Sequence, residues 1–154
     1  MSRLKTLCQK VDQELLKMED PDKRRSAYVH LYGVSLSASL IAEKRHLNAE
    51  LASMAAMLHD IYAYKTGSYE DHARRGAEIA KTILDDLGLT TEEETACICH
   101  AISRHDSKDE RDEPLDEVLK DADVMQHTMQ DLSKAVKEKE KARYEALRVE
   151  FGLN

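Results

Sequence analysis

An imidazole and a carboxylate stand side by side in the string Met57-Leu58-His59-Asp60-Ile61. The pair lies at the end of a segment that is apolar almost throughout, so both side chains are expected to be buried. Burying a histidine and an aspartate without partners would be costly. A carboxylate beside a neutral imidazole nitrogen is a natural pair of ligands for a divalent transition metal. The string therefore predicts a metal site inside the protein.

Two further polar residues stand in apolar helical segments and can complete such a site. His30 is the only histidine in the apolar middle of residues 22–44, and Asp123 lies in the string Leu119-Lys-Asp-Ala-Asp-Val-Met. Asp121 and Asp123 would point to nearly opposite sides of a helix, so one is expected to face inward while the other meets solvent. Antiparallel packing of three helices would then gather four ligands around one cation: His30, His59, Asp60 and Asp123.

The elements that must position these residues are predicted to be helices. Gly and Pro are scarce, with five and two residues, which argues against a β-sandwich or barrel. Apolar residues recur three or four positions apart, as on the buried face of a helix. We predict an all-α fold, a single-domain bundle of about seven helices over residues 1–154. Four helices are expected over residues 3–18, 22–44, 49–62 and 71–87. A fifth starts at Thr90 or Thr91 and ends near Arg104-His105, a sixth follows Pro114, and a seventh covers about 131–150.

Three local expectations follow from the same pattern. Gly33 costs helix stability and is expected to allow the close approach of a neighbour. Residues 106–113 contain no apolar side chain, which predicts a solvated, mobile loop. The last predicted helix should bury one apolar face, formed by Ala135, Val136, Tyr144, Leu147 and Phe151.

Charge and composition restrict the class of partner. The net charge of −7 argues against binding a polynucleotide, but a metal can supply positive charge locally for a small phosphorylated molecule. Three cysteines, Cys8, Cys97 and Cys99, make no disulfide framework and indicate a reducing, cytoplasmic location. No apolar run is long enough for a membrane span, and no signal peptide is recognised.

The ordered pattern His30, His59-Asp60, Asp123 on a helical background resembles the HD superfamily of metal-dependent phosphohydrolases. The resemblance covers roughly residues 22–128, with helices 3–18 and 131–150 packed on that core. It implies that His30, His59, Asp60 and Asp123 are metal ligands.

Two further strings resemble other segments of that family: Asp71-His72-Ala-Arg-Arg-Gly76-Ala77 and Cys99-His-Ala101-Ile102-Ser-Arg-His105. By the resemblance, His72 and His105 bind a second ion, with Asp60 as the bridge. His100 and His105 are five residues apart, so only one of them should face the metal. The family segment favours His105. His127 shares a helix face with Asp123, but a surface or packing role is expected for it.

The activity implied is hydrolysis of a nucleotide, phosphomonoester or phosphoanhydride by metal-activated water. His59 and Asp60 would carry the chemistry, while Lys65 and Arg104 are candidate cations for the phosphate charge. Lys108 and Arg111, in the predicted loop, are weaker candidates. One or two divalent ions would bind, and the ligands do not distinguish Mn, Fe, Mg, Ni, Co or Zn.

The sequence departs from the HD-GYP subgroup, which acts on cyclic dinucleotides. It has no Gly-Tyr-Pro triplet and no Gly after the His-Asp pair, and Val124-Met125 replaces the usual Arg-Leu. Two other functions stay open, namely a module that senses a nucleotide without turnover and a di-iron oxygenase. A homo-oligomer is compatible with all three functions.

Overall fold

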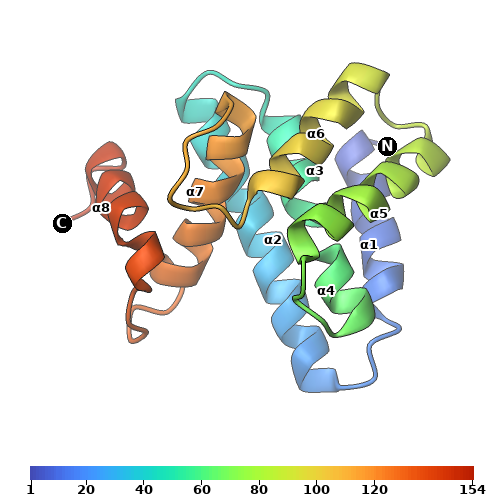
Figure 1. The fold of residues 1–154 in the computed structure, drawn as a ribbon, viewed down its shortest axis with the longest axis horizontal. Helices are drawn as coiled ribbons and strands as arrows, with labels where there is room; N and C mark the ends of the chain where they lie inside the picture. Colours follow the sequence, from blue (N-terminus) through green and yellow to red (C-terminus); the bar gives the residue numbers. More distant parts are fainter.

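Eight α-helices and one short 3-10 helix form the computed structural model, which describes residues 1–154 (Figure 1). There are no strands, so the predicted all-helical class is confirmed. The α-helices are α1 (Arg3–Leu15), α2 (Pro21–Lys44), α3 (Ala49–Leu58), α4 (Ile61–Thr66), α5 (His72–Leu87), α6 (Glu92–Arg104), α7 (Pro114–Met129) and α8 (Lys141–Glu150). The 3-10 helix η1 (Glu138–Glu140) precedes α8.

Local side chains set where several helices begin. The Asp20 carboxylate accepts hydrogen bonds from the backbone at the start of α2, with Pro21 in the first helical position. The Asn48 side chain caps α3 in the same way. At the start of α6, Thr91 and Glu94 form a reciprocal capping box. These caps fix the entry points of helices that carry site residues.

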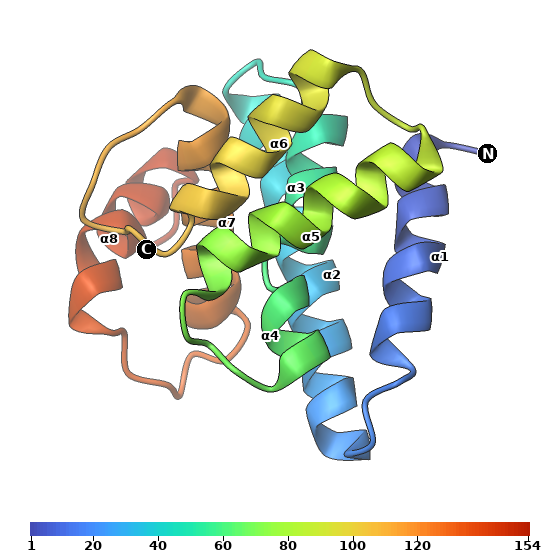
Figure 2. The same cartoon turned by 45° about the vertical axis from the view of Figure 1, so that its right-hand side comes forward.

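The packing places α2 at the centre of the bundle, against α3 and α7. Helices α5 and α6 pack against each other and cross α3, while α1 lies at one end of the molecule (Figure 2). Helix α8 lies at the opposite end, beside α7 (Figure 1). One core of 27 buried apolar residues joins these layers. None of the helices has the length and apolar character that crossing a bilayer requires.

The chain breaks where a single helix over residues 49–62 was predicted. Helix α3 ends at Leu58, and Asp60 leaves helical geometry with φ −107° and ψ 12°. Helix α4 then occupies most of the segment 63–69 that was expected to be a loop. The break lies at the His59-Asp60 pair, and it lets these neighbouring side chains approach a common point.

The C-terminal prediction of one helix over residues 131–150 is wrong in its first part. Residues 131–137 are not helical, and α8 begins only at Lys141. Ala135 is exposed and Val136 is half-buried, whereas Leu147 is buried as predicted. The first part has few apolar side chains to bury, and helices without a buried face gain little stability. Helix α1 similarly ends at Leu15 rather than at residue 18.

A buried carboxylate on α1 makes the stability depend on pH. Glu14 is 6% exposed, and its oxygens lie 2.9 Å from Lys17 Nζ, 3.1 Å from Lys10 Nζ and 3.2 Å from Lys65 Nζ. The hydrogen bond from Lys17 is the largest cause that lowers the pKa of Glu14 to about 2. Because the folded pKa lies below the unfolded one, this stabilisation is complete above about pH 4.5 and is lost as pH falls towards 2.

We expect Glu14→Gln to lower the free energy of unfolding at pH 7 by about 1–2 kcal/mol, since the partly solvated lysines weaken each pair. The variant should also lose less stability than wild type between pH 5 and pH 3. Urea denaturation at both pH values measures this, with the exposed Glu19→Gln as the control. An unchanged pH dependence in Glu14→Gln would contradict the assignment.

Candidate metal centre

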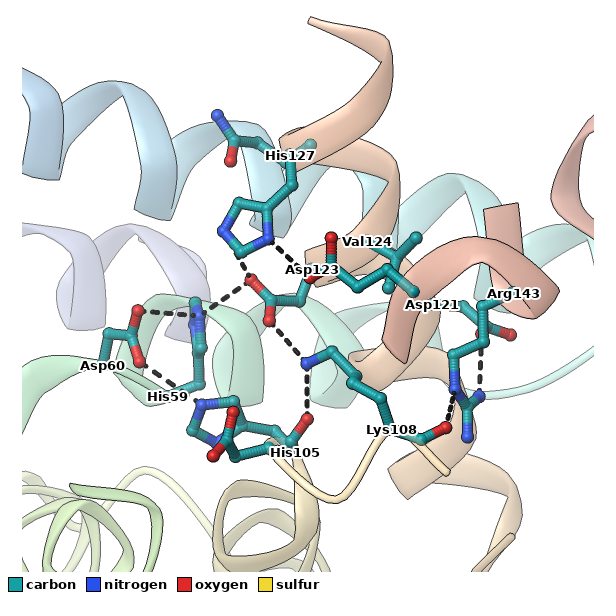
Figure 3. A network of polar contacts seen from close by, with 12 residues as sticks. His59, Asp60, His105, Lys108, Asp121, Asp123, Val124, His127 and Arg143 are labelled. Atoms are coloured by element: carbon teal, nitrogen blue, oxygen red, sulfur yellow. Dashed lines mark hydrogen bonds and ion pairs between the residues drawn. The ribbon is translucent and has the colours of Figure 1, made fainter. Parts of the chain in front are cut away.

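The four residues predicted to share one cation come together from three parts of the chain. His30 lies on α2, His59 and Asp60 lie at the break after α3, and Asp123 lies on α7. His30 Nε2 is 3.2 Å from Asp60 Oδ2 and 3.4 Å from Asp123 Oδ1. His59 Nε2 is 3.4 Å and 3.6 Å from the same two oxygens (Figure 3). We call this cluster the first half-site.

A second cluster lies on the other oxygen of Asp60. His105 Nε2 is 3.3 Å and His72 Nε2 is 3.5 Å from Asp60 Oδ1, and the two nitrogens are 3.2 Å apart. We call these three residues the second half-site. The two oxygens of one carboxylate therefore face two separate groups of imidazoles. A carboxylate placed in this way could offer one oxygen to each of two cations.

Each of the four histidines is oriented by a hydrogen bond from its other ring nitrogen. Nδ1 of His59 donates to the Ala56 carbonyl, and Nδ1 of His105 donates to the Ile102 carbonyl. Nδ1 of His72 donates to the Tyr69 carbonyl, and Nδ1 of His30 donates to the Gln126 side-chain oxygen. With the proton used at Nδ1, the lone pair of the neutral ring is at Nε2. In its neutral form, each of the four rings therefore points its lone pair at an Asp60 or Asp123 oxygen. Such outer partners typically orient histidines that bind metal.

A glycine makes the orientation of His30 feasible. The Gln126 amide donates to Gln130 Oε1 at 2.8 Å, which leaves Gln126 Oε1 to accept from His30 Nδ1 at 2.6 Å. A Cβ on Gly33 would lie 2.9 Å from Gln126 Cγ, closer than carbon atoms normally approach. The predicted close approach at Gly33 is therefore confirmed, and its effect is to let Gln126 reach His30.

Both carboxylates are buried and incompletely paired. Asp60 is 7% exposed and Asp123 is 5% exposed, and the Oδ1 atom of each has no hydrogen-bond donor. Burial favours the neutral acids, but the His59 and Lys108 charges outweigh it, so the pKa values of Asp60 and Asp123 lie well below the usual range. Two ionised carboxylates with buried, unpaired oxygens call for a cation.

The imidazoles respond to the same charges. Burial opposes protonation of His59, but the Asp60 carboxylate and then Asp123 outweigh it and raise the pKa of His59 to about 10. Burial lowers the pKa of His105, which keeps that ring neutral. A proton on His59 Nε2 and a metal ion would compete for the same lone pair.

The spacing of the donor atoms fits metal ions. Two ligands bound at about 2.1 Å to one octahedral or tetrahedral ion lie about 3.0–3.4 Å apart. The contacts to the Asp60 oxygens, at 3.2–3.5 Å, are close to that range. Imidazole nitrogen and carboxylate oxygen suit Mn, Fe, Co, Ni or Zn, whereas a soft-metal site would need sulfur. The residues present therefore fit one ion in each half-site.

The structure does not bring two of the predicted phosphate-binding cations to this cluster. Lys65 pairs with Glu14 on α1, and Arg104 pairs with Glu110 and Asp112. Neither residue lines the cavities beside the cluster. Both side chains are paired with carboxylates outside the cluster, and the spacing of residues along the sequence does not show these pairs.

Of the two histidines in the second half of the segment 92–105, only one faces the buried carboxylates. His105 faces Asp60 and is 2% exposed. The side chain of His100 is 53% exposed, and its Nδ1 lies 2.8 Å from Asp116 Oδ2. The structure therefore turns His105, and not His100, towards the carboxylates.

Two sequence expectations near the site are wrong. Lys108 was assigned to a solvated loop but is 5% exposed, and its ammonium donates to Asp123 Oδ2 at 2.6 Å and to the His105 carbonyl (Figure 3). Asp121 was expected to meet solvent if Asp123 faced inward. It is 8% exposed, because Arg45 and Arg143 cover it. Both differences come from packing against distant segments.

His127 also belongs to the surroundings of the first half-site. Its Nε2 lies 3.5 Å from Asp123 Oδ1, and its ring stacks on that of His30 with centroids 5.0 Å apart. Its position four residues after Asp123 was the signal for this placement.

Two depressions with shared lining residues lie beside the cluster. A cavity of about 260 Å³ is lined by residues of both half-sites and by Lys108, Lys137 and Lys139. A groove of about 990 Å³ runs along the start of α2 and the segment after α7. The cavity and the groove share six lining residues, so a ligand could extend from one into the other: His30, Tyr64, Tyr69, His127, Lys137 and Glu140.

Comparison with known families agrees with this geometry. The HD domain family model matches residues 27–128, and the chain therefore belongs to the HD domain family. The matched range nearly coincides with the predicted core of 22–128 and contains all six clustered residues. No curated protein and no solved structure matches the chain.

Proposed function

We propose that this protein is a metal-dependent phosphohydrolase that acts on a small phosphorylated molecule with two divalent ions. The observation that supports this most is the arrangement around Asp60, whose two buried oxygens each face a pair of imidazole lone pairs. When bound, the ions would lower the pKa of a water molecule and polarise phosphoryl oxygens. Three unpaired cysteines agree with a reducing, cytoplasmic location, which is part of the proposal.

The residues of this chain would divide the work as follows. Asp60 spans both half-sites and fixes their separation. His30, His59 and Asp123 complete the first half-site, and His72 and His105 complete the second. The Nδ1 hydrogen bonds hold the rings in place, so little reorganisation is needed when the reaction occurs.

Substrate charge would be met at the cavity wall. Lys137 and Lys139 line the cavity, and Lys137 has no carboxylate partner. Burial raises the pKa of Tyr64, so its hydroxyl stays protonated and can donate to a phosphoryl oxygen. A cavity of about 260 Å³ that shares lining residues with the groove suits a nucleotide or a similar phosphate ester better than a polymer.

The proposed function is tested by phosphate release. The protein would be freed of metal, loaded with Mn²⁺ or, without oxygen, with Fe²⁺, and incubated with nucleoside mono-, di- and triphosphates, dinucleoside polyphosphates and p-nitrophenyl phosphate. We expect metal-dependent hydrolysis of at least one class, abolished by EDTA and reduced at least about 1000-fold in Asp60→Ala. Asp86→Ala, which replaces an exposed aspartate on α5 that does not line the cavity, is the control for folding.

Other outcomes would overturn the proposal. Nucleotide-induced thermal stabilisation of the metal-loaded protein without any product would favour a sensing module. Oxygen consumption and an optical change in the reduced iron form, with no phosphate released, would favour an oxygenase.

A further inference from the structure

The C-terminal segment lies outside the region that matches the HD family, yet it reaches back to the metal centre. Arg143 on α8 donates from Nε to the Lys108 carbonyl at 2.8 Å and from Nη2 to the Glu110 carbonyl at 2.9 Å. Its Nη1 donates to Asp121 Oδ1 at 2.9 Å (Figure 3). The Arg143 side chain is 13% exposed. One guanidinium thus fixes the backbone on both sides of residue 109 and joins it to α7.

The segment that Arg143 holds carries Lys108, which contacts both half-sites. Its buried ammonium donates to Asp123 Oδ2, the oxygen that faces away from the imidazoles. Asp123 Oδ1 is left to face His30 and His59. The same ammonium donates to the carbonyl of His105, a member of the second half-site. Lys108 therefore determines which Asp123 oxygen is offered and links it to the end of α6.

A second contact from the C-terminal segment reaches the same carboxylate. Glu140 in η1 is 2% exposed and lies 3.0 Å from Nδ1 of His127, which donates to it. His127 Nε2 in turn faces Asp123 Oδ1 at 3.5 Å. Glu140 bonds the His127 ring and Arg143 bonds the Lys108 backbone, and the side chains of His127 and Lys108 lie next to the two oxygens of Asp123.

We propose that the segment 138–150 is part of the metal centre, and that Arg143 and Lys108 are positioning residues that hold Asp123 as a single-oxygen ligand. The inference rests on the metal binding proposed above. A role in folding alone would predict lower stability of the metal-free protein with unchanged affinity for metal. A positioning role predicts weaker metal binding in protein that is folded.

The test measures Mn²⁺ binding to the full chain by calorimetry and the melting temperature of each metal-free form. The variants are Lys108→Met and Arg143→Gln, and the matched control is Arg148→Gln, whose guanidinium on the same helix bonds only the Tyr144 hydroxyl. Loss of an outer partner typically weakens metal binding about 10–100-fold. We expect that range for Lys108→Met, a smaller change in the same direction for Arg143→Gln and none for Arg148→Gln.

The outcomes separate the two levels of inference. If the wild type binds no Mn²⁺, the proposed function fails. If the wild type binds Mn²⁺ and Arg143→Gln binds it equally well, the role assigned to the C-terminal segment is overturned. Should Lys108→Met fail to fold because Asp123 loses its partner, Arg143→Gln, which keeps Lys108, still decides the question.

Discussion

Asp60→Ala is expected to abolish stable binding of both metal ions. The side chain offers Oδ2 to the first half-site and Oδ1 to the second, so one substitution removes a ligand from each. Since losing an outer partner alone costs about 10–100-fold in affinity, losing a shared ligand should cost more than about 100-fold at both positions. The metal content after dialysis should fall from about two ions per chain to well below one.

The control for Asp60→Ala is another aspartate of the same cavity. Asp106 is exposed, lines the cavity and pairs with Lys139, but it lies outside the two half-sites. Asp106→Ala should keep the wild-type metal content. If Asp60→Ala also kept it, Asp60 would not be the bridge.

His72→Ala is expected to remove one ion and leave the other. Of the buried carboxylate oxygens, His72 faces only Asp60 Oδ1, which belongs to the second half-site, and its Nδ1 bond to the Tyr69 carbonyl orients it there. The first half-site keeps all four of its ligands, so about one ion per chain should remain. Metal analysis after dialysis measures the effect on binding. The phosphate-release assay measures turnover, and we expect turnover to fall at least about 100-fold.

His100→Ala is the matched control for His72→Ala. His100 lies on α6 near His105, but its ring turns outward to Asp116. Its replacement should leave both ions and the turnover unchanged. Loss of metal in His100→Ala equal to that in His72→Ala would contradict the assignment of the second half-site.

The centre of the candidate site could be predicted from residue types and order. A histidine beside an aspartate after a strongly apolar helix, with His30 and Asp123 in other apolar segments, carries the signal in the sequence itself. Burial of such groups requires partners, and only a few arrangements of helices provide them. The structure brings these residues together with His72 and His105, which the family resemblance singled out.

The outer partners could not be predicted because they depend on packing between distant segments. Lys108 lies among charged residues that read as a solvated loop, yet its ammonium is buried against Asp123, and Arg143, 35 residues later, binds its carbonyl. Asp121 alternates with Asp123 on α7, but α8 covers the side that was expected to face solvent. Helix α4 was also missed, because periodicity does not show that a helix breaks and restarts at Asp60.

The central claim is that one cluster of histidines and aspartates binds two divalent ions that share Asp60. The most direct measurement is the number of Mn²⁺ ions per chain after anaerobic loading and dialysis, together with the electron paramagnetic resonance spectrum. We predict about two ions per chain with the spectrum of a magnetically coupled pair, as a shared carboxylate requires. A protein that retains no Mn²⁺, or two ions without magnetic coupling, would contradict this account.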